Sequence, residues 1–193
     1  AGRALPEVRV HEPSIAVVTA PRTGSGSSTA AAAGARIEGG VQRFEDHVDT
    51  DAIIPGQFCH LTAVEELGDK CFHLVRPEFS VRARAGQSIV VAGEAWGSGS
   101  SREQAVWALQ GAGIRAVVAK SFAFIHKRNL VNEALPYLIV KDEAFYALAQ
   151  EGRRVVVDLA RSEVVVDGRS FAAEAVSPIV AALRAAGGLV PAI

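Results

Sequence analysis

A glycine- and serine-rich segment carries the residues whose types and spacing best suit chemistry. It reads GEAWGSGSSRE and runs from Gly93 to Glu103, between a predicted strand and a predicted helix. Its glycines let the backbone turn sharply and approach a ligand closely. Ser100 and Glu103 have the S-x-x-E spacing of a capping box, which places Ser100 or Ser101 at a helix N-terminus, where free N–H groups attract anions. Arg102 adds a fixed cation whose guanidinium fork suits a carboxylate, so the segment predicts an anion site.

A structural interpretation of the same segment stays open, in which Ser100 only caps a helix and Arg102 points into solvent. The combination of glycines, serines and an arginine favours the anion site. The segment has none of the G-x-x-x-x-G-K, G-x-S-x-G or G-x-G-x-x-G signatures, so a phosphate or dinucleotide cradle is only a weak alternative.

A second segment, EDHVDTDAIIP from Glu45 to Pro55, gathers carboxylates around His47. Its acidic residues are Glu45, Asp46, Asp49 and Asp51. Clustered acids with a histidine could bind a cation or position a hydroxyl group. An Asp-rich turn before a buried strand explains the same pattern. The other chemically suggestive histidines, His60, His73 and His126, are isolated and more typical of packing or surface positions.

Apolar patterns predict alternating strands and helices that position these segments. The predicted strands are Ser88–Ala92, Ile114–Ala119, Leu138–Lys141, Val155–Leu159 and Glu163–Val166. The predicted helices are Ser101–Gln110, Phe122 to about Glu133, Glu143–Gln150 and Pro178–Ala186. This alternation is typical of an α/β domain.

The composition excludes several classes of protein. Hydrophobic residues make up 49% of the 193 residues and the net charge is -1, so no basic surface for nucleic acid is expected. The two cysteines, Cys59 and Cys71, lack the spacing of a zinc or iron–sulfur site, so we expect no metal ligands in this chain. No apolar run is long enough to span a bilayer and no signal pattern is present, so we expect a soluble protein with no membrane partner. The compartment expected is a reducing one, the cytoplasm or the matrix of an organelle in a eukaryote.

The N-terminal part differs from the rest of the chain. Residues 23–35 read TGSGSSTAAAAGA, which is typical of a flexible linker, and Ile15–Val18 could form at most one short strand. The sequence contains no methionine. We therefore predict that residues 1–22 end a preceding segment or form a leader, that residues 23–36 are a linker, and that residues 37–193 form the domain.

Several motifs together resemble a known family. In order along the chain they are VDTDAIIP (Val48–Pro55), GSGSSRE (Gly97–Glu103), AKSFAFIHKRN (Ala119–Asn129) and the pair Leu135–Pro136. This combination is similar to the small subunit, or swivelling domain, of the aconitase and isopropylmalate isomerase family. The resemblance runs from about Gly40 to Val140. The stretch Leu61–Phe79 is similar to the version that pairs with a separate large chain.

The resemblance implies a fold, a cofactor and a partner. The fold is a swivelling β/β/α three-layer domain of the α/β class, which closes over a catalytic part that holds a [4Fe–4S] cluster. A cluster-bearing large subunit or domain, and not this chain, would provide the cluster ligands. The source of that partner, a separate chain or the same polypeptide, stays open.

The resemblance also implies a reaction and residue roles. The reaction is the reversible dehydration and rehydration of a 2- or 3-hydroxy acid, in which iron of the cluster acts as Lewis acid on the leaving hydroxyl. Ser100 corresponds to the base, Arg102 to the clamp of a substrate carboxylate, and Asp51 to a residue that lines the catalytic site. Ser101 and Thr50 correspond to further substrate contacts.

The substrate is less closely defined by the resemblance. Phe58 matches the aromatic position of isopropylmalate enzymes, whereas Cys59 replaces their leucine. No arginine lies nearby, which disfavours a citrate-like third carboxylate. The best interpretation is 3-isopropylmalate dehydratase. Homoaconitase, an aconitase-like enzyme, an alkylmalate (dimethylmalate-type) dehydratase and a non-catalytic carboxylate-binding module stay open. Lys120 and Asn129 match the family pattern and could equally be structural.

Overall fold

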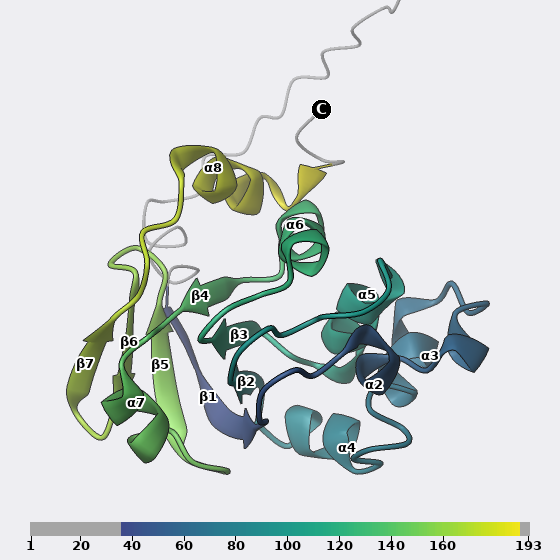
Figure 1. Cartoon of the computed structure of the whole chain (residues 1–193), viewed down its shortest axis with the longest axis horizontal. Helices are drawn as coiled ribbons and strands as arrows, with labels where there is room; N and C mark the ends of the chain where they lie inside the picture. The colour runs from purple at the N-terminus through teal and green to yellow at the C-terminus, as the bar shows by residue number, and fades with distance from the viewer. Residues whose placement is uncertain (1–35, 190–193) are drawn as a thin grey trace, which may run out of the picture.

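Seven strands form one mixed sheet in the computed structural model, which describes residues 36–189 (Figure 1). The strands are β1 (Arg36–Arg43), β2 (Ile89–Ala92), β3 (Ala116–Ala119), β4 (Tyr137–Ile139), β5 (Arg154–Asp158), β6 (Glu163–Val166) and β7 (Arg169–Ala172). Their order in the sheet is β4-β3-β2-β1-β5-β6-β7. Three sequence predictions lie outside the described residues. They are the segment of residues 1–22, the short strand considered at Ile15–Val18, and the linker 23–36 except for its last residue.

The strands from β1 to β4 are parallel to one another. The register pairs Val41 with Ile89, Val90 with Val117, and Val118 with Leu138. Strands β2 and β3 read IVVA and AVVA, and every residue of both is buried. Continuous apolar strands of this kind are typical of a parallel sheet that is covered on both faces. The C-terminal ends of β1, β2 and β3 therefore meet at one edge of the sheet, where ligands commonly bind in such folds.

The strands from β5 to β7 form an antiparallel extension. Strand β5 pairs with β1 through Ile37 and Val157, and the β5–β6 and β6–β7 connections are antiparallel hairpins. In Figure 1 these strands turn away from the parallel strands. Strand β1 thus belongs to both parts of the sheet.

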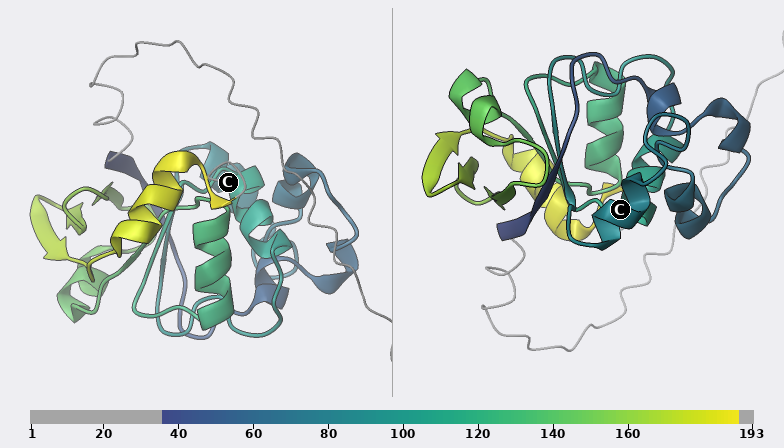
Figure 2. Two further views of the ribbon diagram at one scale, coloured as in Figure 1. Left: turned by 90° about the horizontal axis from the view of Figure 1, so that it is seen from above. Right: turned by 90° about the horizontal axis from the view of Figure 1, so that it is seen from below.

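Eight short helices complete the described part of the chain. They are α2 (Thr50–Ile53), the 3-10 helix η1 (Gly56–Phe58), α3 (Val64–Asp69), α4 (Phe79–Arg84), α5 (Gln104–Ala112), α6 (Phe124–Asn132), α7 (Glu143–Leu148) and α8 (Pro178–Ala186). Figures 1 and 2 show α8 beside α6, where the backbone at Gly188 contacts the end of α6 at Asn132. None of the helices in residues 36–189 is both long enough and apolar enough to cross a membrane.

The side chains of the central strands alternate between two cores. In β2, Val90 and Ala92 pack with the helical cluster, which includes residues of α2 to α6. Ile89 and Val91 pack on the opposite face with the antiparallel strands and α7. The domain therefore has a layer of antiparallel strands, a layer of parallel strands and a layer of helices, which confirms the predicted β/β/α arrangement of the α/β class.

Most of the sequence-based elements are confirmed within a few residues. Helix α8 has the predicted bounds Pro178–Ala186, and β6 has the predicted bounds Glu163–Val166. Strands β1 and β7 and helices α2, α3 and α4 were not predicted. Strand β1 begins at Arg36, the last residue of the segment predicted as a linker.

Two glycines let α3 and α5 approach each other closely. A Cβ atom at Gly68 of α3 would overlap the backbone of Gly111 in α5, and a Cβ atom at Gly111 would overlap the carbonyl of Val64. In both cases the added Cβ would overlap backbone atoms, which cannot move aside by rotation as side-chain atoms can. The contact therefore depends on the absence of side chains at both positions.

We predict that Gly68→Ala destabilises the domain by roughly 2–3 kcal/mol, because an inserted methyl group forces apart two packed helices. Urea unfolding followed by circular dichroism measures the change in the free energy of unfolding. Glu65→Ala is the matched control, since Glu65 is an exposed residue of the same helix. Equal stabilities of the two variants would contradict the close approach.

Candidate active site

The two chemically suggestive segments run side by side beyond the ends of β1 and β2. The N–H of Gly97 donates to the carbonyl of Val48 at 2.8 Å, and the N–H of Thr50 donates to the carbonyl of Ser98 at 2.9 Å. Asp49 and Ser98 form a parallel bridge. The structure therefore brings the DTD and GSGSSRE segments together through backbone hydrogen bonds.

The segment after β3 supports the other side of the same loop. The N–H of Trp96 donates to the carbonyl of Ser121 at 3.1 Å, and the N–H of Ala123 donates to the carbonyl of Trp96 at 2.9 Å. The hydroxyl of Ser121 donates to the carboxylate of Glu94 and accepts from the N–H of Ala95 at 2.9 Å. All three motif segments are thus held at one edge of the sheet.

Two glycines give the loop its path. Gly97 and Gly99 have φ angles of +75° and +87°, in the left-handed region that glycine adopts most easily. A Cβ atom at Gly97 would overlap the ring of His126, so the imidazole packs directly on the loop backbone. Gly99 immediately precedes Ser100, which is exposed.

Ser100 is exposed, and its backbone is fixed by Thr50. The Thr50 side chain is buried, at 1% exposure, and its hydroxyl donates to the carbonyl of Ser100 at 2.9 Å. Ser101 is also exposed. The contact of Thr50 with a substrate stays a prediction, and the contact that the structure contains is with the loop itself.

The predicted capping box is wrong. Helix α5 begins at Gln104, and its N-cap is Glu103, which is itself helical and makes no side-chain capping hydrogen bond. Ser100 and Ser101 therefore lie before the helix, and the carbonyl of Ser100 accepts from the Thr50 hydroxyl instead of from an N–H of α5. The macrodipole of α5 therefore acts on Ser100 from a greater distance than the S-x-x-E spacing predicted.

Arg102 is anchored on one side only. Its Nη1 donates to Asp51 Oδ1 at 2.6 Å and to the carbonyl of Ile54 at 3.1 Å, and 20% of the Arg102 side chain is exposed. A Cβ atom at Gly56 would lie 3.4 Å from Nη2, so the glycine leaves this side of the guanidinium uncrowded. Among the described residues, Nη2 has no hydrogen-bond partner. The arrangement fixes the cation and leaves one nitrogen for an anionic ligand.

The acidic residues around His47 have separate structural contacts. Asp46 accepts from the N–H of Glu94 at 2.7 Å, and Asp49 caps α2 by accepting from the N–H of Ala52 at 2.7 Å. Within residues 36–189 no three histidine, cysteine or carboxylate side chains are placed to hold a metal ion.

Phe58 lies at the end of η1, next to His73, which the sequence analysis treated as isolated, and next to Lys70, which it did not single out. Its ring meets the His73 ring edge to face at 5.4 Å, and the ammonium of Lys70 lies 5.5 Å from the Phe58 ring centre. Lys70 and His73 are more than ten positions away in the chain, and no motif joins them to Phe58. Only the folded structure places a cation beside the residue predicted to select the substrate.

The two further motif residues occupy structural positions. The ammonium of Lys120 bonds both carboxylate oxygens of Glu143, at 2.7 and 2.8 Å, and lies over the Tyr146 ring. Asn129 is buried in α6. The Lys120 contacts join the segment after β3 to α7.

Comparisons with known proteins agree with this architecture. The family described as the aconitase C-terminal domain matches residues 78–143. The methanogen homoaconitase small subunit of Methanocaldococcus jannaschii is 39% identical over 156 residues, which cover 80% of this chain and 89% of that protein. The solved structure of 3-isopropylmalate dehydratase from the same organism matches with a TM-score of 0.74 and 38% identity, over 81% of this chain and 92% of that one.

The fold is therefore that of a swivelling β/β/α domain. The chain belongs to the aconitase C-terminal domain family. Aconitase AMT8 of Alternaria alternata is 44% identical over 132 residues, which are 68% of this chain and 16% of that protein. The chain thus spans about a sixth of the length of this fungal relative.

His126 is a buried histidine beneath the loop. It is 2% exposed, and neither ring nitrogen has a hydrogen-bond partner among the described residues. Burial lowers its pKa from 6.5 to about 4 because the charged imidazolium loses its hydration. The ring is therefore neutral wherever the domain is folded near neutral pH.

We predict that His126 makes the stability of the domain depend on pH. Between pH 6.5 and pH 4 the unfolded chain binds a proton at His126 that the folded chain does not, so stability is full above pH 6.5 and falls as the pH decreases. The loss between pH 7 and pH 5 is about 2 kcal/mol. Urea unfolding at the two pH values measures it.

His126→Phe should remove this part of the pH dependence, whereas the exposed His60→Phe should retain it. A His126→Phe variant with the same pH dependence as the parent chain would show that His126 is not the titrating group.

Proposed function

We propose that this chain is the small subunit, or C-terminal swivelling domain, of an iron–sulfur hydro-lyase that isomerises a hydroxy acid by dehydration and rehydration. The best-supported activity is 3-isopropylmalate dehydratase. Two matches support it, namely the solved 3-isopropylmalate dehydratase structure and the 3-isopropylmalate dehydratase small subunit of Saccharolobus islandicus, which is 37% identical over 79% of this chain and 91% of that protein. One observation carries the proposal: the loop that exposes Ser100 also holds Arg102, anchored through Nη1 with Nη2 free of partners among the described residues.

Arg102 is proposed to bind a substrate carboxylate. Asp51 and the Ile54 carbonyl hold Nη1, so the guanidinium is oriented before a ligand arrives. A carboxylate can then bond Nη2, with little loss of side-chain freedom on binding. The bound carboxylate would lie close to the loop that carries Ser100.

Ser100 is proposed to remove the proton from the carbon next to that carboxylate. As the alkoxide, its Oγ takes the proton and becomes the hydroxyl, while hydroxide leaves from the neighbouring carbon and a double bond forms. Rehydration then adds hydroxide to the carbon that lost the proton, and Oγ returns a proton to the carbon that lost the hydroxide. A serine hydroxyl is a weak base, so the step requires positive potential from Arg102 and from backbone N–H groups of the loop. Thr50 is proposed to position Ser100 through its bond to the Ser100 carbonyl. Ser101 is proposed to contact the substrate.

A partner is proposed to hold the [4Fe–4S] cluster. The described residues do not fit a cluster, since they include no group of three metal-ligating side chains, and both cysteines lie apart as free thiols. In this family the cluster supplies Lewis-acid chemistry at the substrate hydroxyl. We also propose a reducing compartment, the cytoplasm or an organelle matrix, which the free thiols of Cys59 and Cys71 support.

Phe58 is proposed to contact the alkyl group of the substrate. The nearby Lys70 favours a second candidate, homoaconitase, because a cation beside Phe58 could bind an additional carboxylate. Assays of the assembled enzyme with isopropylmalate and with homoaconitate distinguish the two. Turnover of homoaconitate alone would replace the first assignment with the second.

We predict that Ser100→Ala lowers turnover at least about 100-fold, because the proton acceptor is lost. The measurement is hydration activity of the complex with its cluster-bearing partner, purified anaerobically from the native host. Ser98→Ala in the same loop is the control and should retain activity, since only the Ser98 backbone makes a loop contact. Folding and partner association should be unchanged in both variants. Unchanged turnover in Ser100→Ala would exclude the serine as the base.

We predict that Arg102→Lys raises KM more than about tenfold with a smaller change in kcat. A lysine keeps the charge but cannot bond Asp51, the Ile54 carbonyl and a ligand in the same planar geometry. Steady-state kinetics of the same complex test this. The control is Arg115→Lys, at an exposed position beside β3, which should have parent kinetics. A parent-like KM in Arg102→Lys would remove Arg102 from substrate binding.

A further inference from the structure

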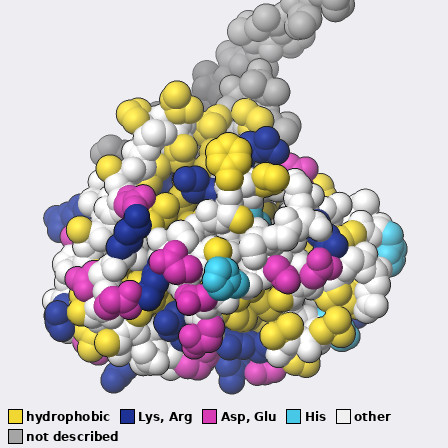
Figure 3. Space-filling view, in the orientation of Figure 1, with side chains coloured by type: hydrophobic (Ala, Val, Ile, Leu, Met, Phe, Trp, Pro, Cys, Tyr) yellow, Lys and Arg dark blue, Asp and Glu magenta, His cyan; other side chains and the backbone are white. Residues whose placement is uncertain are grey.

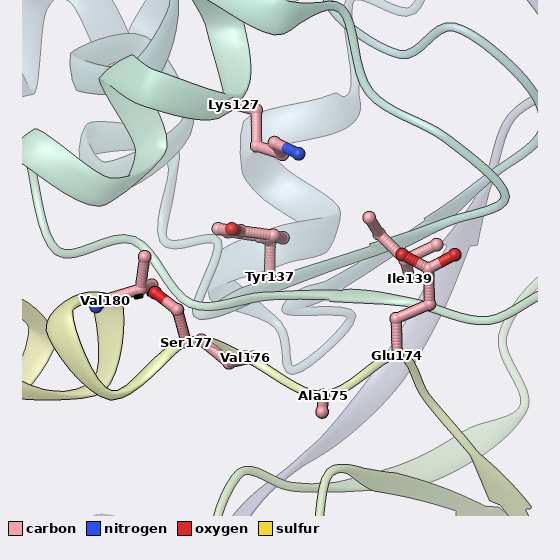
Figure 4. Close-up of a pocket in the computed structure, with 8 residues that line it drawn as sticks. All are labelled: Lys127, Tyr137, Ile139, Glu174, Ala175, Val176, Ser177 and Val180. Atoms are coloured by element: carbon pink, nitrogen blue, oxygen red, sulfur yellow. Dashed lines mark hydrogen bonds between the residues drawn. The ribbon is translucent and has the colours of Figure 1, made fainter.

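A cavity of about 270 Å³ lies outside the candidate active site. It is bounded by β4, by α6 and by the segment that leads into α8 (Figure 4). Its lining includes Lys127 and Tyr137, and none of its lining residues belongs to the site described above. The volume is just below the usual range of small-molecule pockets, about 300–1,000 Å³, so a ligand would be small.

The cavity lies on the far side of the segment after β3. Tyr137 in its wall meets Phe122 edge to face, with ring centres 5.2 Å apart. Phe122 in turn pairs through its backbone with Trp96, which precedes the Ser100 loop. The cavity and the candidate active site therefore share a structural wall but no lining residue.

The charges around the cavity do not balance. Glu174, the acidic residue of the lining, is paired with Lys141 at 2.9 Å. Lys127 has no ion pair among the described residues. Behind the wall, Nη2 of Arg184 is buried with no hydrogen-bond partner in the described part of the chain, and its charge acts on Tyr137. Lys127 in the lining and Arg184 near Tyr137 thus have no acidic partner within residues 36–189.

Tyr137 offers a hydrogen-bond donor to the cavity. Its side chain is 8% exposed, and its hydroxyl has no hydrogen-bond partner in residues 36–189. Burial raises the pKa of the phenol, and the nearby Arg184 partly offsets this rise, so the O–H keeps its proton at neutral pH. Figure 4 shows the ring between Lys127 and the segment Glu174–Val180. The hydroxyl of Tyr137 can therefore donate a hydrogen bond to a ligand in the cavity.

The remaining wall is apolar. Ile139, Val176 and Val180 line it, and the nearby α6 and α8 expose Phe124 at 77% and Ile179 at 72%. Figure 3 shows hydrophobic side chains gathered over α6 and α8 with basic side chains next to them. A ligand that suits this lining has an apolar body as well as an anionic group.

We propose that this cavity binds a short branched-chain carboxylate. Lys127 pairs with the carboxylate, Tyr137 donates a hydrogen bond to it, and the alkyl body contacts Ile139, Val176 and Val180. This site is independent of the proposed hydro-lyase activity, because it uses no residue of the Ser100 loop.

The test is titration of isovalerate into the full chain, followed by protein NMR. Isovalerate should bind with a dissociation constant on the order of 1 mM, as expected for so small a ligand. Isoamyl alcohol, which has the same alkyl body without the charge, and inorganic phosphate, which lacks the alkyl body, should each bind at least tenfold more weakly. Absence of isovalerate binding, or tighter binding of either comparison compound, would overturn the proposal.

Variants locate the bound acid. Lys127→Gln and Tyr137→Phe should each weaken isovalerate binding, Lys127→Gln by at least tenfold, and melting curves check that both variants fold. Arg128→Gln is the control, because Arg128 is the exposed neighbour on α6 and does not line the cavity. Arg102→Lys should leave the affinity unchanged. Loss of binding in Arg102→Lys with retention in Lys127→Gln would move the acid to the candidate active site and overturn the proposal.

Discussion

The pairing of β1 with two different neighbours is the constraint on which the rest of this structure depends. β1 is parallel to β2 on one side and antiparallel to β5 on the other, so it joins the two parts of the sheet. Its glycines permit this position, since a Cβ atom at Gly39 would overlap the side chain of Ser88 next to β2. Because β1 is parallel to β2, the segments that follow the two strands leave the same edge and can bond each other. The candidate active site is the product of that pairing.

The site combines rigid backbone with side chains that serve different purposes. Thr50 is buried and uses its hydroxyl on the Ser100 carbonyl, whereas Asp51, one residue later, is exposed and bonds Arg102. The short helix α2 explains this division, because consecutive helical residues point in different directions. Asp49 starts the helix as its N-cap. The three residues of the DTD motif thus have three functions: one ends the loop, one supports Ser100 and one orients Arg102.

The sequence predicted the elements that are specified by their own residues. These are β2 and β3, which are continuous apolar runs, and α8, which has a cap, and the structure contains all three within a few residues of the predicted bounds. β1 was missed because RIEGGVQR contains two glycines and three charged residues, and it is a strand only through its neighbours. The capping box was also wrong: α5 begins only at Gln104, and Ser100 lies in the loop before it, where its carbonyl accepts from Thr50, which is 50 positions away. Likewise, Lys70 reaches Phe58 only through the fold.

The structure places Ser100 and Arg102 on one loop but leaves Ser100 exposed to water, in a medium where the charge of Arg102 acts weakly. Ser100 is exposed to solvent, and two unit charges 4 Å apart in water interact by only about 1 kcal/mol, whereas near a covered protein surface they interact by about 4 kcal/mol. The charge of Arg102 can therefore stabilise a serine alkoxide far better once water is excluded. Under the proposed function, the partner that holds the cluster also has to cover this edge of the sheet. Under the proposed function, contact with the partner would thus activate the base as well as complete the metal site, and the proposed catalytic residues could therefore lie on a surface that is exposed in the domain alone.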